Sequence, residues 1–316
     1  MQVIRGYEGL SEDQRGASAA LGNFDGVHRG HQALIAEAAR AGAPLSAPVG
    51  VITFEPHPRR FFQPDAPPFR LTPAPEKARI LAALGVERVH ELTFDAALAG
   101  TEPEDFAGRI LAAGLGIRHL VVGENFRFGR ARRGDAAMLR AMGERLGFTV
   151  SIVHLLEGAT GRYSSTAVRV HIEQGNCEEA ARHLGRWHAV RGPVIEGDRR
   201  GRSLGFPTAN LALGEQIVPR HGIYAARTEL LTGPHAGVHD GVASIGVRPT
   251  FGDNAANFEV HLFDFEGDLY GAEIAAGLVS FLRPEARFET PEALTAQMRA
   301  DAALARHRLA HARIPA

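Results

Sequence analysis

The chain has 316 residues, which is enough for two domains that each bury their own core. Its 35 lysine and arginine residues are balanced by 36 acidic ones, so the net charge favours neither a nucleic acid nor an anionic membrane as partner. The single cysteine, Cys177, excludes an internal disulfide and any multi-cysteine metal site. Charged residues interrupt positions 1–22, and no uncharged apolar run is long enough to span a bilayer. We therefore expect a soluble protein with a cytoplasmic location.

Short apolar runs alternate with segments of helical period from Ala17 to Leu156. This alternation predicts a parallel sheet covered by helices, in the form of a Rossmann-like doubly wound domain. The expected strands and helices, in chain order, are 19–21, 32–40, 49–54, 76–84, 86–94, 103–113, 119–122, 136–146 and 149–156. The only lysine of the chain is Lys77, so a Walker A loop, which needs Gly-Lys-Ser or Gly-Lys-Thr, is absent.

The pattern changes after two short helices, which are expected at 167–174 and 178–184. From Trp187 onward, strand-like runs separated by Gly, Pro and Asp predict an antiparallel, Greek-key-like β-barrel. These runs are 190–195, 222–231, 241–246, 258–265 and 273–282, and a terminal helix is expected from Pro291 to Leu309. We therefore predict two domains, residues 1–185 and 186–316.

A glycine-rich segment, GNFDGVHRGH at 22–31, lies between the first expected strand and the first expected helix. Its glycines let the backbone approach a triphosphate, and the helix start offers unpaired N–H groups. His28 and His31 lie on one face of that helix, where both can donate to phosphate oxygens. On spacing alone, a zinc pair or two ordinary surface histidines would fit as well. The flanking glycines and the strand-to-helix position favour the phosphate site.

Three further segments carry candidate ligand contacts in the same half of the chain: FEPHPRRFF at 54–62, GENFRFG at 123–129 and SSTAVR at 164–169. Ser-Ser-Thr by itself is typical of a helix N-cap, and an aromatic cluster is typical of a core. The first two segments, however, follow expected strand ends, where binding loops are common. The arginines at 127, 130, 132 and 133 fit either a solvated loop or a phosphate contact.

Segment 22–31 resembles the GxFDGxHxGH signature of HxGH nucleotidyltransferases in the form used by prokaryotic FAD synthetases. Segment 163–169 is similar to the second nucleotide element of that family, with Tyr163 in place of the usual Ile. The resemblance implies ATP binding by Gly22, Phe24, Asp25, Gly26, His28, His31, Ser164, Ser165, Thr166 and Arg169. It implies flavin binding by Pro56, Pro58, Phe62, Asn125, Arg127 and Phe128.

The second half of the chain contains GRSLGFPTANL at 201–211, in which Thr208 and Asn210 offer oxygen ligands at alternate positions. Such ligands suit magnesium, although the composition alone also fits a Gly/Pro turn between strands. The segment resembles the GxPTAN signature of riboflavin kinases, and 246–251 and 258–262 match that family too. The resemblance implies Mg²⁺ coordination by Thr208 and Asn210, and a catalytic carboxylate at Glu259. It also implies ATP binding by Gly201, Gly205, Phe206, Pro207, Thr208 and Asn210.

Together the two resemblances imply a bifunctional enzyme that uses ATP twice, first to make FMN from riboflavin and then to make FAD from FMN. The first step needs a base such as Glu259 because its acceptor is an un-ionised alcohol. The second step needs only charge stabilisation, since the FMN phosphate, with a second pKa of about 6, is already largely dianionic. Two alternatives stay open, namely a flavin- or nucleotide-binding regulator without turnover and an enzyme with one live module. The expected partners are riboflavin, FMN and ATP, with no nucleic acid and no membrane.

Overall fold

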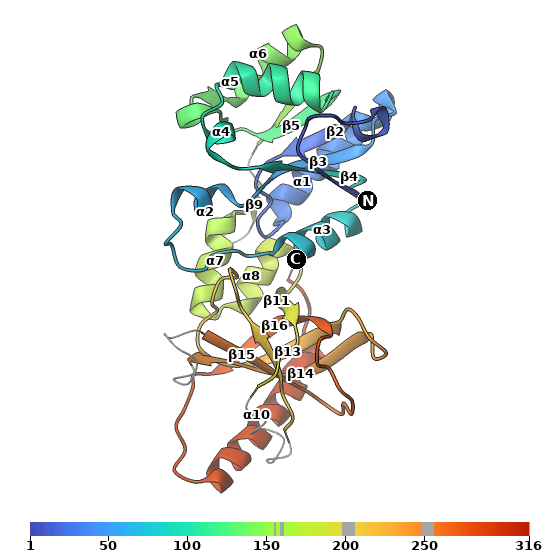
Figure 1. The fold of residues 1–316 in the computed structure, drawn as a ribbon. Helices are drawn as coiled ribbons and strands as arrows, with labels where there is room; N and C mark the ends of the chain where they lie inside the picture. Colours follow the sequence, from blue (N-terminus) through green and yellow to red (C-terminus); the bar gives the residue numbers. More distant parts are fainter. Residues whose placement is uncertain (155, 159–160, 198–205, 248–255, 316) are drawn as a thin grey trace. The chain divides into compact units, whose positions relative to one another are not determined.

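The computed structural model describes residues 1–154, 156–158, 161–197, 206–247 and 256–315 (Figure 1). The chain packs as two compact units. Unit 1 comprises Met1–Ala66 and Ala74–Tyr163, and unit 2 comprises Pro67–Pro73 and Ser164–Ala316. This division concerns packing, and the predicted functional boundary between residues 185 and 186 stays a prediction. Within the described residues, no helix is both long and apolar enough to cross a membrane.

Unit 1 is built on a six-stranded, all-parallel sheet in the order β1-β4-β3-β2-β5-β8. Its strands are β1 (Gln2–Arg5), β2 (Ser18–Leu21), β3 (Val49–Glu55), β4 (Arg88–Thr93), β5 (His119–Gly123) and β8 (Thr149–Val153). The predicted parallel sheet is thus confirmed. The edge strand β1 was not predicted because only one of its four residues, Ile4, is buried, so it presents no apolar run.

Helices of unit 1 pack on both faces of this sheet, α1 (Arg29–Gly42) and α3 (Ala74–Ala83) on one and the π-helical segment η3 (Phe106–Gly114) and α6 (Ala136–Leu146) on the other. The shorter helices of the unit are α2 (Pro58–Phe62), α4 (Ala96–Ala99) and α5 (Pro103–Asp105). Successive strand residues point to opposite faces, so Leu21 packs with η3 and α6 while its neighbour Ala20 packs with α1 and α3. Short pairings complete the unit: β6 (Arg127–Phe128) with β7 (Gly134–Asp135), and β9 (Glu157–Gly158) with β10 (Gly161–Arg162).

The direction in which the chain adds strands reverses between β2 and β5. From β2 the chain adds β3 and β4 on one side, whereas β5 pairs with β2 on the other side and is followed by β8. Because ligands of open parallel sheets bind beyond the carboxyl ends of the strands at such a reversal, this edge is where a nucleotide site is expected. The loops that begin at Gly22 and Glu124 leave the sheet there side by side, since Ala20 is paired with Val121.

Unit 2 contains an antiparallel sheet in the order β11-β16-β13-β14-β15-β12. Its strands are β11 (His188–Pro193), β12 (Ala209–Ala212), β13 (Gly222–Leu230), β14 (Gly237–Val247), β15 (Ala256–Leu262) and β16 (Glu273–Arg283). An antiparallel bridge between Ile195 and Asn210 joins the two edges, and this contact confirms the predicted barrel. The C-terminal helix α10 (Pro291–His311) is capped by Thr290 and packs Ala305 and Leu309 on the outside of the barrel.

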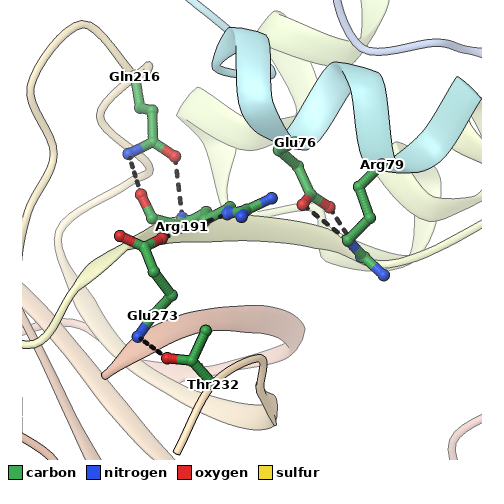
Figure 2. A network of polar contacts seen from close by, with 6 residues as sticks. All are labelled: Glu76, Arg79, Arg191, Gln216, Thr232 and Glu273. Atoms are coloured by element: carbon green, nitrogen blue, oxygen red, sulfur yellow. Dashed lines mark hydrogen bonds and ion pairs between the residues drawn. The ribbon is translucent and has the colours of Figure 1, made fainter. Parts of the chain in front are cut away.

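Seven residues from the first half of the chain are built into unit 2. In this segment, Pro67–Pro73, the N–H of Arg70 donates to the Glu215 carbonyl at 2.9 Å, and the N–H of Ile217 donates to the Arg70 carbonyl at 2.8 Å. Figure 2 shows the adjacent side chain of Gln216, which bonds both the N–H (2.9 Å) and the carbonyl (2.8 Å) of Arg191.

An apolar cluster joins the same segment to two helices of unit 2, α7 (Ser165–Gln174) and α8 (Cys177–Leu184). The members of the cluster are Leu71, Val168, Ile172, Ala180, Leu184 and Ile217. The segment therefore holds the loop before β13 and both helices together. Nothing in the local sequence of 67–73 predicted this role.

Candidate active sites

The histidine loop between β2 and α1 has an unusual backbone. Phe24, Gly26 and Val27 have φ values of 51°, 85° and 41°, in the left-handed region that a β-branched residue such as Val rarely adopts. Phe24 and Val27 are both fully buried, and their packing holds the loop in this shape. Strained backbone of this kind is concentrated at functional sites.

His28 is the N-cap of α1, because its Nδ1 accepts the N–H of His31 at 3.3 Å. An accepting Nδ1 carries no proton, so in the neutral ring the proton is on Nε2, which is then a donor. The rings of His28 and His31 stack with centroids 3.7 Å apart. The cap engages one nitrogen of His28, and the described part of the chain holds no group of three His, Cys, Asp or Glu side chains suited to a metal. The phosphate contacts of His28 and His31 stay a prediction.

The predicted flavin contacts of unit 1 follow β3 and β5. Phe62 is 65% exposed and belongs to an edge-to-face cluster with Phe61 and Phe94, whereas Asn125 lies exposed in the turn after β5. The ring of Phe128 is buried and packs against Phe106 at 5.6 Å. In this structure the Phe128 ring is part of the core, and its flavin contact stays a prediction.

The basic run after β5 has acidic partners that the sequence did not suggest. Arg127 is paired with Asp135 at 3.2 Å, and Arg130 and Arg133 both contact Glu102. These pairs are exposed, and a stronger anion can compete for such side chains at small cost. Arg127 therefore remains a candidate phosphate contact. Pro56 is exposed after β3, and Pro58 is the first residue of α2.

The Ser-Ser-Thr element belongs to unit 2. Ser164 is the N-cap of α7 and accepts the N–H of Ala167 at 3.1 Å, so the helix-cap interpretation is correct for this residue. Ser165 and Thr166 form the first turn of α7. The Nε of Arg169 donates to the carbonyl of Phe69 at 2.9 Å, and its guanidinium lies over the Phe69 ring. The segment Pro67–Pro73 thus orients Arg169, and the role of these residues in ATP binding stays a prediction.

The carboxylate of Glu259 is held at both oxygens in the barrel. Thr208 donates its hydroxyl to Oε2 at 3.1 Å, and Asn257 donates its amide to Oε1 at 2.7 Å. The register of β12 and β15 pairs Asn210 with Glu259, which places the candidate magnesium ligands beside the carboxylate. Sequence reasoning did not identify Asn257. Its role depends on a side-chain contact with Glu259, which lies two positions further along β15.

A cavity of about 310 Å³ opens next to Thr208 and Glu259, in the size range of small-molecule sites. It lies between the barrel and α10, and we call it the barrel cavity. Its apolar wall includes Ile223, Val242, Phe288 and Met298. Arg283 lines it as well and makes a bidentate pair with Asp301 of α10, with a closest approach of 2.7 Å. The sequence pattern did not identify this wall, because it is assembled from β13, β14, α10 and the segment before α10.

A second, smaller cavity of about 70 Å³ lies against Val194, Pro207, Leu269 and Tyr270, and Thr208 lines both cavities. The two hollows therefore meet at the hydroxyl of Thr208. Phe206 stacks edge-to-face on His261, whose Nδ1 donates to the Pro207 carbonyl at 2.8 Å. Gly201 and Gly205, the other predicted nucleotide contacts, lie outside the described residues.

Asp264, the acidic residue nearest to Glu259 in the following sequence, is engaged elsewhere. Both of its oxygens bond Arg306, at 2.8 and 2.9 Å. The hydrogen bonds from Arg306 lower the pKa of the Asp264 carboxyl, which makes it a weaker base. Glu259 is therefore the better candidate for proton abstraction in the barrel.

An α/β unit with a phosphate-type loop at its strand reversal, joined to a barrel with a hydrogen-bonded carboxylate beside a cavity, defines a two-module transferase that uses nucleotides. Comparison with known proteins agrees in both halves. Residues 10–167 match the FAD synthetase family and residues 184–309 match the riboflavin kinase family. The chain belongs to the family of bifunctional riboflavin kinase/FMN adenylyltransferases.

Relatives with this name cover almost the whole chain. The protein of Pseudomonas fluorescens is 42% identical, and that of Escherichia coli K12 is 40% identical, each over 97% of both chains. A crystal structure described as a macrolide-efflux protein from Streptococcus pneumoniae aligns with a TM-score of 0.85 at 29% identity, over 96% of this chain and 98% of that one. That likeness supports the fold of the whole chain, and the efflux name stays with that protein.

Proposed function

We propose that the chain makes FAD from riboflavin in two ATP-dependent steps, with the kinase step in the barrel and the adenylyl transfer at the strand ends of unit 1. The family match assigns the riboflavin kinase to the C-terminal half and the FAD synthetase to the N-terminal half. The observation that carries the residue assignment is the position of Glu259, held by Thr208 and Asn257 beside the barrel cavity. The substrates are riboflavin, FMN and ATP.

In the kinase step, the terminal hydroxyl oxygen of riboflavin forms a bond to the γ-phosphorus of ATP, and the bond from that phosphorus to ADP breaks. Glu259 accepts the hydroxyl proton, which a neutral alcohol does not lose by itself at pH 7. The barrel cavity is the proposed flavin site, and the smaller cavity across Thr208 is the proposed nucleotide site. The hydrogen bonds from Thr208 and Asn257 hold the carboxylate beside the barrel cavity.

The residues beside Glu259 fit a magnesium ion. Thr208 and Asn210 offer neutral oxygens, the ligand type that Mg²⁺ prefers together with nucleotide phosphates and water. The hydroxyl hydrogen of Thr208 is directed at Glu259, so the lone pairs of its oxygen are oriented away from the carboxylate. Bound there with ATP, the ion would neutralise charge on the transferred phosphate.

In the adenylyl transfer, an oxygen of the FMN phosphate forms a bond to the α-phosphorus of ATP, and diphosphate leaves. The attacking group is already an anion, so the protein has to supply donors rather than a base. The Nε2–H of His28, the imidazole of His31 and the N–H groups at the start of α1 are such donors. We further propose that the protein is cytoplasmic, because both steps consume ATP.

The test is to incubate the purified chain with ATP and Mg²⁺ and to separate the flavins by chromatography, starting once from riboflavin and once from FMN. If both modules are active, the reaction that starts from riboflavin should give FMN and then FAD, and the reaction that starts from FMN should give FAD. FAD from FMN without any FMN from riboflavin would mean that only the adenylyltransferase is live. No product from either substrate would favour a flavin-binding regulator.

A further inference from the structure

The only lysine of the chain lies where the two predicted substrate loops of unit 1 meet. Lys77 is at the end of the first turn of α3, and its side chain is 2% exposed. Its ammonium donates to the hydroxyl of Thr53 at 3.1 Å and to the carboxylate of Glu55 at 2.7 Å. Both partners are at the carboxyl end of β3, two positions apart and therefore on one face of the strand.

Each partner of Lys77 leads to a different loop. The hydroxyl of Thr53 donates in turn to the carbonyl of Asn23 at 3.0 Å, inside the histidine loop that is proposed to bind ATP. Glu55 directly precedes Pro56, where the loop proposed to bind the flavin begins. One buried ammonium is thus bonded to the supports of both loops.

We propose that Lys77 is a positioning residue for adenylyl transfer, which keeps the ATP loop and the flavin loop at a fixed separation through Thr53 and Glu55. The proposal rests on the assignment of this reaction to the loops of unit 1. In-line attack of one bound substrate on another is sensitive to displacements of about 1 Å, so a shared anchor for the two loops has a direct effect on rate.

The chemistry of the site explains a lysine in a chain whose other cations are arginines. A compact ammonium can donate to two acceptors in different directions within a small buried space, whereas the planar guanidinium fork needs more room and a flat pair of acceptors. Lys77→Arg is therefore expected to behave as a defective variant and not as a conservative one.

Variants of the full-length chain can separate the two contacts of Lys77. Thr53→Val removes the contact on the side of the ATP loop, Glu55→Gln weakens the one on the side of the flavin loop, and Lys77→Met removes both. Thr53→Ser is the conservative variant. Thr53→Val should raise the KM for ATP by about tenfold with little change for FMN, and Glu55→Gln should do the reverse. Lys77→Met and Lys77→Arg should lower kcat/KM for adenylyl transfer by about a hundredfold. Thr53→Ser keeps the hydroxyl and should stay close to wild type.

Thermal unfolding followed by circular dichroism reports whether unit 1 of each variant is folded, riboflavin phosphorylation reports on the barrel, and Arg40→Met is the matched control. Arg40 pairs with Glu37 at 2.7 Å on the surface of α1, so this variant also removes a cation from an ion pair and should leave both activities unchanged. If Lys77→Met unfolds unit 1, the comparison between Thr53→Val and Glu55→Gln decides the question.

FAD formation within about threefold of wild type in Thr53→Val and Glu55→Gln, or equal changes of both KM values in each, would overturn the proposal. A parallel His31→Ala variant tests the underlying site. Full FAD formation by that variant would show that the loop assignment itself is wrong, independently of the result at Lys77.

Discussion

The two candidate sites of this chain are built in different ways. The site of unit 1 consists mainly of loops at the ends of parallel strands, with backbone N–H groups, imidazoles and cations. The barrel site consists mainly of side chains on paired antiparallel strands, with a carboxylate held by two hydrogen bonds. The difference follows from the chemistry of the two attacking groups. The phosphate of FMN needs positioning, whereas the hydroxyl of riboflavin also needs a base.

The largest effect is expected from Glu259→Gln, which keeps the shape of the side chain and removes the proton acceptor. The kinase turnover should fall by about 10²- to 10⁴-fold, while FAD formation from supplied FMN continues. Steady-state rates with riboflavin and with FMN measure the two effects. Asp264→Asn is the matched control, since Asp264 is bound to Arg306, and it should retain kinase turnover. Turnover of Glu259→Gln within about threefold of wild type would exclude this residue as the base.

A reciprocal effect is expected from His28→Asn and His31→Ala. Asn at position 28 can still cap α1, so this variant removes the imidazole donor without removing the cap. FAD formation should fall by about 10²- to 10³-fold, and riboflavin phosphorylation should stay unchanged. The comparison between the two sites would fail if either variant reduced both activities equally.

Fragments of unit 2 sharpen the question of where the kinase module begins. Fragments starting at Ser164 and at Arg186 should both phosphorylate riboflavin, because the barrel and α10 are present in each. The longer fragment should be more stable by about 3 kcal/mol, since it keeps the contacts of Ile217 with Val168, Ile172 and Leu184. Urea unfolding followed by the fluorescence of Trp187 measures the difference. A folded but inactive fragment from Arg186 would reject the predicted boundary.

A smaller effect is expected on the stability of the two units at acidic pH. Burial lowers the pKa of His90, in unit 1, to about 4, and that of His188, in unit 2, to about 3. An unfolded histidine has a pKa of about 6.5, so below that pH the unfolded chain binds more protons and each unit loses stability. Between pH 6.5 and 5 the loss should be about 2 kcal/mol for each histidine.

His90→Leu and His188→Leu should each flatten this acid limb in one unit. Trp187 is the only tryptophan and reports on unit 2, whereas circular dichroism reports on both units. His307→Leu, at an exposed position on α10, is the control and should leave the pH dependence as in wild type. An unchanged acid limb in both core variants would mean that other groups control acid unfolding.

Local sequence signals were sufficient for most of the fold, whereas the site residues that they indicated stay predictions. Alternation of apolar residues predicted the sheet and the barrel, because burial on one face repeats every second residue in a strand and every third or fourth in a helix. The motifs at 22–31 and 206–210 lie at the sheet edge and beside Glu259, at the positions where their chemistry is expected. The N-cap at Ser164 was readable from residue type alone.

Other features depended on contacts between residues that are far apart in the chain. The sequence alone determined which residue types were available for phosphate, magnesium and proton transfer. Only the tertiary structure decided that Phe128 is packed in the core, that Pro67–Pro73 belongs to unit 2, and that Thr208 holds Glu259. It also decided that Lys77 joins the supports of two loops. The physical reason is that motifs and periodicity record local conformation and burial, whereas these roles are set by which distant side chains share a buried space.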